Sequence, residues 1–432
     1  MTTVDAGPTT ARLLAGLGAG VGRLDLASHA AVHGPLAVPG RRDRRWADSL
    51  VEVIERSGIT GRGGAGFPTA RKLETLRSER RRPLVVVNAM EGEPASRKDQ
   101  FLATRVPHLV LDGAALLAAC VNAPSISVCV ARGADTAARS FGAAVAERER
   151  AGLDPVPITV LRPPGRYVAG EESALSNWLA GNDSRPQYRP DRPAIPRVKG
   201  RPALVDNAET LAHIALLARY GAEWFRELGT QGSPGTTLIT VSGAVDDPGI
   251  LEVPFGTPVA AVLANAGAGS TGGVLLGGFG GTWLASGDVG TPYDPVSLGA
   301  VGCTTGVGVM VALPPGGCGL AETARIAHWM ASESAGQCGP CAFGLPAVAQ
   351  DLTMLARGRA GHRDADRLWA RLGMIEGRGA CRHPDGVVRL LRSAVTAFAD
   401  DVNRHLSIGP CPGAAWPSVV PLPRTQEVME WR

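Results

Sequence analysis

The residues of this chain that are best suited to chemistry begin with a glycine-rich run, GRGGAGFPTARK, at 61–72. The run places four glycines around an arginine and ends on an aromatic residue and a lysine: Gly61, Arg62, Gly63, Gly64, Gly66, Phe67 and Lys72. Glycine reaches positive φ and lets backbone amides approach a ligand without a Cβ in the way. Together with the positive charges, these amides favour a flat anionic cofactor such as a nucleotide or a flavin phosphate.

The run matches neither of the common phosphate-binding fingerprints. It does not read GxGxxG after a strand, and no GK[ST] follows it. The chain also holds 56 glycines in 432 residues, about twice the usual ~7%, so glycine clusters arise more easily by chance. On these residues alone, a phosphate site and a plain glycine loop are equally good interpretations.

Two further segments carry acidic side chains. LVVVNAMEGEP (84–94) reads as a buried strand that ends at Asn88 and is followed by Glu91 and Glu93. Open α/β sheets bind ligands at such strand ends, so these two acids indicate a ligand site.

GRYVAGEESAL (165–175) places an aromatic residue, a glycine and two acids before a helical segment: Tyr167, Gly170, Glu171 and Glu172. Because the helix dipole stabilises carboxylates at a helix start, spacing alone favours helix caps over ligand contacts for the two acids.

Three cysteines near the C-terminal end have the spacing of a metal site. Cys338 and Cys341 form CGPC, and Cys381 follows in GACRHPDG. Helical segments before, between and after would place all three at one end of a bundle. With His383 they have the ligand types of a structural zinc site, whereas CxxC alone also suits a redox dithiol.

Taken in order, these motifs resemble the flavin subunit of respiratory NADH–quinone oxidoreductase and its relatives in soluble hydrogenases and formate dehydrogenases. GRGGAGFPT matches that family's nucleotide loop, and NAMEGEP resembles its N-A-D-E-x-E-P turn, with Met90 where an acid is usual. YVAGEESAL resembles Y-x-x-G-E-E-T-A-L. VDNAETLAHI (205–214) resembles V-N-N-V-E-T-L, with Asp206 in place of the first Asn, followed by Asn207. The resemblance covers about residues 50–400.

The resemblance implies an FMN-dependent NADH dehydrogenase. FMN would lie in a cleft made by the glycine-rich loop, Asn88, Glu91, Tyr167 and Asn207, and NAD(H) would stack on it, near Phe67 and Glu93. The flavin would accept hydride and release single electrons. Family members carry an aromatic residue after the lysine, where this chain has Leu73.

The resemblance also implies an iron–sulfur cluster at Cys338, Cys341 and Cys381. The family motif S-C-G-x-C-x-P-C begins with a further cysteine, and Ala335 stands at that position here. Three thiolates would hold [3Fe–4S], or [4Fe–4S] with an oxygen or non-protein fourth ligand. Ser334 and Cys411 are the fallback candidates for that ligand, whereas the length of the intervening helix excludes Cys318.

The fold class predicted from the pattern is α/β. Short β-rich runs at 84–88, 125–132 and 157–163 alternate with helical stretches at 107–122 and 135–151, which predicts a largely parallel sheet. With the family resemblance, we expect in order an N-terminal arm, an FMN-binding α/β domain, a small ubiquitin-like β-grasp domain, a linker, a helical iron–sulfur domain forming a bundle and a Pro-rich tail: 1–50, 51–235, 236–290, 291–319, 320–405 and 406–432.

Composition and charge limit the cellular environment and the kinds of partner that we expect for this protein. The formal net charge of +4 is too small to indicate nucleic-acid binding. No apolar run approaches the ~20 residues that span a bilayer, so we expect no direct membrane insertion. No basic region begins a secretory signal, and eight cysteines in a long chain favour metal over disulfides. These features predict a cytoplasmic protein.

Single electrons need an acceptor, and the sequence shows no second iron–sulfur motif. We therefore expect a small iron–sulfur partner protein or subunit of the ferredoxin or thioredoxin-fold type. Three alternatives stay open: direct reduction of a quinone or dye, an FMN-only NAD(P)H dehydrogenase without a cluster, and a non-catalytic assembly paralogue.

Overall fold

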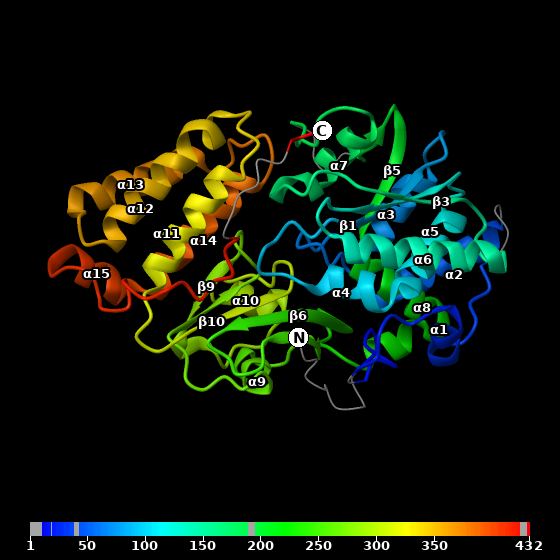
Figure 1. Ribbon diagram of the computed structural model, residues 1–432, viewed down its shortest axis with the longest axis horizontal. Helices are drawn as coiled ribbons and strands as arrows, with labels where there is room; N and C mark the ends of the chain where they lie inside the picture. The colour runs from blue at the N-terminus through cyan, green and yellow to red at the C-terminus, as the bar shows by residue number, and fades with distance from the viewer. Residues whose placement is uncertain (1–10, 19, 39–42, 189–194, 424–429) are drawn as a thin grey trace.

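The computed structural model describes residues 11–18, 20–38, 43–188, 195–423 and 430–432. Figure 1 shows three parts: an α/β domain, a small β domain beside it, and a helical domain at the far end of the long axis. The three parts meet near the middle of the molecule, where the candidate site lies.

The α/β domain is built on a five-stranded sheet in the order β3-β2-β1-β5-β4. Strands β3, β2, β1 and β5 are parallel, and β4 pairs antiparallel with β5 at one edge. The largely parallel α/β sheet predicted from the sequence is therefore confirmed. The strands are β1 (Leu84–Ala89), β2 (Ile126–Val130), β3 (Ile158–Leu161), β4 (Arg197–Val198) and β5 (Arg201–Asn207).

Helices cover this sheet, and α5 is the most deeply placed of them. Every residue of α5 is buried, and Gly113 within it faces the backbone of α8 at Leu211. The helices are α1 (Leu26–His33), α2 (Arg44–Ser57), α3 (Thr69–Arg77), α4 (Lys98–Arg105), α5 (Pro107–Cys120), α6 (Asp135–Ala151), the 3₁₀ turn η1 (Tyr167–Gly170), α7 (Glu172–Leu179) and α8 (Ala208–Arg226).

Within the described residues, no single helix is long and apolar enough to cross a membrane. Helices α4 and α5 satisfy the length and composition test only as a pair that is bent by 95°.

The small β domain contains a second five-stranded sheet in the order β7-β6-β10-β8-β9. Strand β10 lies at its centre, parallel to β6 and antiparallel to β8. The segment 291–319, which we expected to be a linker, therefore supplies the central strand, because its apolar run is fully buried there. The elements are β6 (Thr236–Gly243), β7 (Gly249–Pro254), α9 (Val259–Asn265), β8 (Gly273–Leu276), β9 (Thr282–Ala285), η2 (Ser286–Asp288), α10 (Pro295–Ala300) and β10 (Val309–Leu313).

The helical domain packs its helices around a core of small and branched apolar side chains. Its elements are α11 (Gly319–Ser332), the π-turn η3 (Pro340–Gly344), α12 (Leu345–Ala356), α13 (His362–Ile375), α14 (His383–Ala397) and α15 (Ala399–Ser407).

The C-terminal tail, whose position the sequence did not predict, returns to the α/β domain. The backbone N–H of Ser184 donates to the carbonyl of Trp431 (2.6 Å), and Arg132 donates to the carbonyl of Arg432 (2.7 Å). In Figure 1 the C-terminus accordingly lies beside α7.

The N-terminal arm is held at the seam between the α/β and small β domains. The buried carboxylate of Glu252 on β7 accepts the backbone N–H groups of Arg12 (2.8 Å), Leu13 (3.1 Å) and Leu14 (3.0 Å). Thr236 donates a further hydrogen bond to the same carboxylate (2.6 Å). The arm is therefore anchored to the domains at this point.

The close crossing of α5 and α8 predicts that Gly113→Ala is destabilising. The new Cβ would overlap the carbonyl oxygen of Leu211, and overpacking of this kind costs about 1–3 kcal/mol. Gly142→Ala on the exposed face of α6 is the control: nothing lies near its Cβ, and the change should stabilise the helix slightly. Thermal denaturation of both variants measures the difference. Equal melting temperatures would contradict the close packing of α5 against α8 at Gly113.

Candidate functional site

The candidate site lies at the carboxyl end of the first sheet, between β1 and β5. From β1 the chain continues to β2 and β3 on one side, while β5 pairs with β1 on the other side. Parallel sheets open a ligand crevice at such a reversal of strand order. Asn88 and Asn207 occupy paired positions at the ends of these two strands, so the sequence-predicted residues of both motifs meet there.

The glycine-rich loop lies over this crevice. Thr60 and Pro68 form an isolated bridge, and the N–H of Gly61 donates to the carbonyl of Phe67 (2.9 Å), which closes the loop at its base. Gly64 and Gly66 have φ of 95° and 61°, a backbone region that favours glycine. Among the described residues, the amides from 63 to 66 donate to no protein acceptor and are exposed.

The two basic residues of the loop have positions different from those expected. The guanidinium of Arg62 is buried 4.6 Å from the Phe255 ring centroid and donates to the carbonyl of Thr236 (3.3 Å), so it holds the loop against the small β domain. Lys72 pairs with Glu172 (2.8 Å) and Asp206 (3.3 Å). Burial lowers the pKa of Lys72, but these two carboxylates raise it more, so it stays charged and neutralised within the protein.

Asn88 and Gly170 join the end of β1 to the turn before α7. The side-chain amide of Asn88 donates to the carbonyl of Gly170 (2.9 Å), and a Cβ at Gly170 would lie 2.9 Å from the Cβ of Met90. Met90 itself is buried in an apolar cluster. The position of the family's usual acid is therefore occupied here by a packing residue.

The carboxylate of Glu91 caps α4. It accepts hydrogen bonds from Ser96 (2.7 Å) and from the backbone N–H groups of Asp99 (2.9 Å) and Gln100 (2.8 Å). Its backbone has the positive φ of 36° that this turn requires. Burial, with Asp99 nearby, raises the pKa of Glu91 to about 7.

The adjacent acids before α7 have different partners. Glu171 accepts the backbone N–H groups of Ser173 (2.9 Å) and Ala174 (3.1 Å), which is the helix-cap interpretation of the sequence. Glu172 instead pairs with Lys72 on the other side of the crevice.

A buried ionic network beneath the crevice was missed by the sequence reasoning. Lys98 is 2% exposed in its side chain and contacts Asp99 (2.8 Å) and Glu209 (3.0 Å), while Asn207 donates to Asp99 (2.6 Å). Burial opposes the charge on Lys98, but the two carboxylates raise its pKa above the usual range. Lys98 and Asp99 follow the NAMEGEP motif, and Glu209 lies inside VDNAETLAHI. The charged residues in and beside these motifs were the sequence signal that could have predicted the network.

The carboxylate of Glu93 forms the junction between the α/β domain and the small β domain. It accepts the backbone N–H groups of Ala95 (3.2 Å) and Phe279 (2.9 Å) and the hydroxyl of Tyr167 (3.3 Å). The side chain is buried, and burial raises the pKa of Glu93 to about 7. We expected Glu93 beside the dinucleotide, whereas its oxygens serve as internal acceptors.

Tyr167 extends this junction to the helical domain. Its ring makes edge contacts with Trp329 on α11 (5.4 Å) and His383 on α14 (5.5 Å), measured between centroids. Its backbone N–H donates to Glu333 (3.2 Å). Tyr167 therefore links the turn before α7 to a residue two positions from Cys381. Phe67, by contrast, is 39% exposed on the loop and open to solvent.

Two of the three predicted cysteine ligands are direct neighbours in the structure. The thiol of Cys341 interacts directly with Cys338 and with Ser334, and Cys381 lies within electrostatic range of it. Burial first, and then the neighbouring thiols, raise the pKa of Cys341 above its usual range. His383 directs Nε2 to the carbonyl of Met330 (2.9 Å), so only Nδ1 is left for the zinc alternative.

Cys411, one fallback fourth ligand, lies beside Cys318 at the start of α11, whereas Ser334 follows the end of that helix. A helix of 14 residues spans ~21 Å. The fallback to Cys411 is therefore corrected, and Ser334 is the one of the two fallback residues that lies beside Cys341.

Two surface hollows of about 840 and 540 Å³ lie away from the glycine-rich loop. The first is lined in part by Gln337 and Ala380, neighbours of the cysteine group, and the second lies between β9 and α14. We place the candidate site at the loop and not at these hollows, because the exposed amides and strand ends meet there.

Three family models match the chain. The Nuo51 FMN-binding domain matches residues 54–216, the SLBB domain matches 238–279, and the NADH-ubiquinone oxidoreductase-F iron–sulfur binding region matches 321–405. The first and third matches lie within the α/β and helical domains, and the second covers the small β domain only up to residue 279, before β9 and β10.

Curated relatives match over most of their length. The NADH-quinone oxidoreductase F-2 subunit of Rhizobium meliloti is 30% identical, and the match covers 84% of this chain and 90% of the relative. The corresponding F subunit of Mycobacterium bovis is 30% identical, covering 84% and 86% respectively. That of Escherichia coli is also 30% identical, with 82% and 83% covered.

Solved structures of an NAD+-reducing [NiFe]-hydrogenase have the same fold. The H2-reduced form superposes with a TM-score of 0.76 at 28% identity, covering 84% of this chain and 63% of that chain. The air-oxidised form gives 0.77 at 29% identity, covering 87% and 66%. The chain thus spans just under two thirds of these hydrogenase chains.

The raised pKa of Glu93 predicts a pH dependence of stability. Because the folded protein binds this proton more tightly, its stability should fall as the pH rises from about 4.5 to about 7. Glu93→Gln cannot titrate and should flatten part of that slope, while Glu91 keeps its own part. Thermal melting across this pH range measures the slope. Glu52→Gln, at an exposed position on α2, is the control. A wild-type slope in Glu93→Gln would refute the assignment.

Proposed function

Because this chain belongs to the family of the NADH-quinone oxidoreductase F subunit, we propose that it binds FMN at the β1/β5 crevice and oxidises NADH there. The observation that carries the proposal is the glycine-rich loop over a strand-order reversal, with exposed amides at 63–66 that donate to no described protein acceptor. The match to the FMN-binding family model over the same residues supports it.

The loop residues fit an FMN molecule. A Cβ at Gly63 would lie 3.6 Å from Asn207, and one at Gly64 would lie 3.0 Å from Val307, so side chains here would fill the space above the strand ends. The free amides can donate to a phosphate or to ring oxygens. Asn88 and Asn207 hold the strand ends on which a flat ring can rest, and bound FMN would supply the two-electron to one-electron conversion.

In this proposal Phe67 is the residue that contacts the dinucleotide. Its ring is partly exposed at the end of the loop, where it can stack on a planar ligand. Leu73, at the family's aromatic position, is fully buried in the core of the α/β domain and cannot stack on adenine. We therefore propose weaker adenine contacts than an aromatic side chain would give.

Cys338, Cys341 and Cys381 would hold the iron–sulfur cluster, with Ser334 as the oxygen ligand. Three thiols fit three irons of a cubane, and the serine oxygen near Cys341 fits the fourth. Contact between Tyr167 and His383 makes this group the direct neighbour of the flavin crevice. The helical family model that matches 321–405 supports the assignment.

The proposal includes a partner and a location. The curated relatives are named as subunits, so we propose that this chain also works in an assembly, with a small iron–sulfur protein of the ferredoxin or thioredoxin-fold type as acceptor. We propose a cytoplasmic site of action.

The loop assignment predicts that Gly64→Val abolishes flavin retention. Its branched side chain would press against Val307, whose Cγ1 would lie 3.0 Å from the new Cβ, at a φ of 95° that suits glycine, so the loop proposed to hold FMN would have to shift. Visible absorption and flavin content after purification measure the effect. Gly152→Val is the control, because this residue also has a positive φ of 62°, faces open space and ends α6 away from the crevice. Full flavin content in Gly64→Val would disprove the loop assignment.

The missing fourth thiol predicts that Ala335→Cys stabilises the cluster. Ala335 is 8% exposed and lies between Ser334 and Cys338, so a thiol there would face the same group. Iron content and the rate of bleaching in air should show tighter retention, while Ser334→Ala should bleach faster than the wild type. Ala360→Cys, equally buried in the same domain, is the control. If the wild-type protein prepared anaerobically contains zinc and no iron, the assignment of an iron–sulfur cluster is contradicted.

The partner proposal predicts faster turnover with the right acceptor. Anaerobic NADH oxidation should rise when an oxidised ferredoxin or thioredoxin-fold iron–sulfur protein is added to the purified chain. Cys341→Ser should lose this increase and keep its flavin. Equal rates with every candidate protein, together with rapid quinone or dye reduction, would favour direct transfer from a flavin-only enzyme.

A further inference from the structure

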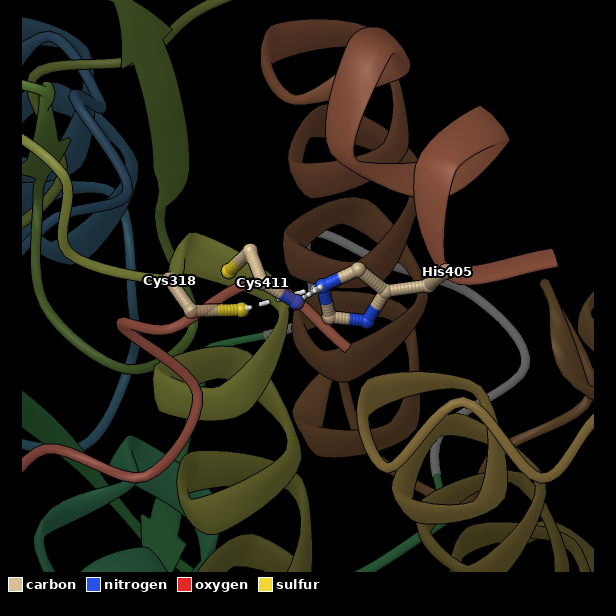
Figure 2. A group of neighbouring side chains, drawn as sticks. All are labelled: Cys318, His405 and Cys411. Atoms are coloured by element: carbon tan, nitrogen blue, oxygen red, sulfur yellow. Dashed lines mark hydrogen bonds between the residues drawn. The ribbon is translucent and has the colours of Figure 1, made fainter. Parts of the chain in front are cut away.

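Cys318, His405 and Cys411 form a second group of metal-binding side chains in the helical domain, apart from the three cysteines assigned above. Their ligand atoms all lie within 4.8 Å of one another. Figure 2 shows the sulfur of Cys318 and the backbone nitrogen of Cys411 directed at one nitrogen of the imidazole ring, with the sulfur of Cys411 on the same side of the ring. The three come from the start of α11, the end of α15 and the C-terminal tail, so the fold assembles the group from distant parts of the domain.

The imidazole of His405 is oriented as in metal-ligating histidines. Nδ1 lies 3.2 Å from the carbonyl of Leu355, an acceptor, so this nitrogen carries the proton. Nε2 accepts the backbone N–H of Cys411 (3.0 Å) and lies 3.9 Å from the sulfur of Cys318. A backbone carbonyl that fixes the other ring nitrogen is the usual support of a histidine ligand. The lone pair on Nε2 is therefore directed to the backbone N–H of Cys411, with the sulfur of Cys318 close by.

Cys318 lies at the N-terminus of α11, where burial raises the pKa of the free thiol to about 12 and the backbone N–H of Ala321 opposes that rise. Its sulfur accepts the backbone N–H of Ala321 (3.4 Å) as the N-cap of α11. The positive end of a helix dipole stabilises a negatively charged sulfur. Cys318 is 2% exposed and His405 is 1% exposed, so a bound ion would be enclosed on these two sides.

We propose that Cys318, His405 and Cys411 bind one structural zinc ion. Tetrahedral zinc with ordinary Zn–S and Zn–N bonds separates sulfur from nitrogen by roughly 3.6 Å. The observed 3.9 Å between Cys318 and His405 needs only a small adjustment. Zinc would replace the hydrogen bond that Nε2 now accepts from Cys411.

A water molecule would complete the tetrahedron. Asp401 lies one turn before His405 on α15, but its carboxylate is not among the ligand atoms that lie within 4.8 Å of one another.

The zinc ion would fix the tail where it turns back along α11. Next to the site, Gly413 pairs with Gly317, and a Cβ at Gly413 would overlap the carbonyl of Gly316. Further along, Ser418 (2.6 Å) and the N–H of Val419 (3.2 Å) donate to Glu322 on α11. The ion would therefore join two segments that are far apart in sequence, at the start of a helix that leads to Ser334 and the cysteine group.

The experiment is metal analysis of the full chain prepared anaerobically without a metal-affinity tag. We expect about one zinc ion per chain in the wild type. His405→Gln and Cys411→Ser should each lose the zinc, keep flavin and iron, and melt at a lower temperature. Cys338→Ser is the matched control, because it should lose iron and keep zinc. Cobalt(II) added to the zinc-stripped chain should give thiolate–cobalt absorption, which Cys411→Ser abolishes.

Three results would overturn the zinc proposal. The first is wild-type protein without zinc that also takes up no cobalt. The second is zinc retained in both His405→Gln and Cys411→Ser. The third is a Cys318–Cys411 disulfide, found by mass spectrometry after alkylation in anaerobically purified protein. Because flavin and iron are measured in the same samples, failure of this site is distinguishable from failure of the proposed function.

Discussion

The buried carboxylate of Glu93 is the interaction on which the arrangement of the three domains depends. It receives hydrogen bonds from its own loop, from the small β domain at Phe279 and from Tyr167. A buried carboxylate is costly unless its oxygens are satisfied, so these donors must stay in place for the fold to hold. The packing leaves little freedom, because a Cβ at Gly278 would lie 2.5 Å from Glu93 and one at Gly92 would lie 2.6 Å from the backbone of Tyr167.

This junction explains how the proposed flavin and cluster sites are kept adjacent. Tyr167 contacts Glu93 on one side and His383 on the other, so it joins the loop after β1 to the start of α14, which follows Cys381 in the sequence. Electron transfer needs short distances between redox centres. In the proposal, residues from all three domains hold the flavin and the cluster close together. The carboxylates of Glu91 and Glu93, which we predicted as ligand contacts, accept hydrogen bonds from within the protein.

The sequence predicted the elements well where a single pattern dominates. The apolar run before Asn88 and the helix at 107–122 appear as β1 and α5, because burial decides both. In the sequence analysis we assigned the segment that contains β10 to a linker. No local sequence pattern shows that a strand will complete a sheet formed by other segments of the chain. The sequence also could not tell that Arg62 points inward or that Glu91 caps α4, because a motif fixes residue types and not side-chain directions.

The departures from the family pattern also have physical explanations. Met90 is buried against Gly170, where an apolar residue packs without needing a partner. Ala335 is likewise buried beside the cysteine group, so its small side chain leaves a place there for a fourth ligand. Ser334 is near enough to Cys341 to supply that ligand as an oxygen.

The most direct test of the central claim is anaerobic addition of NADH to the purified chain, with visible absorption and electron paramagnetic resonance recorded on the same sample. The account predicts that flavin absorption bleaches and that a reduced iron–sulfur signal appears with it. Bleaching of the flavin with no cluster signal, in protein that contains stoichiometric iron, would contradict the proposed path. No response to NADH in flavin-replete protein would contradict the function itself.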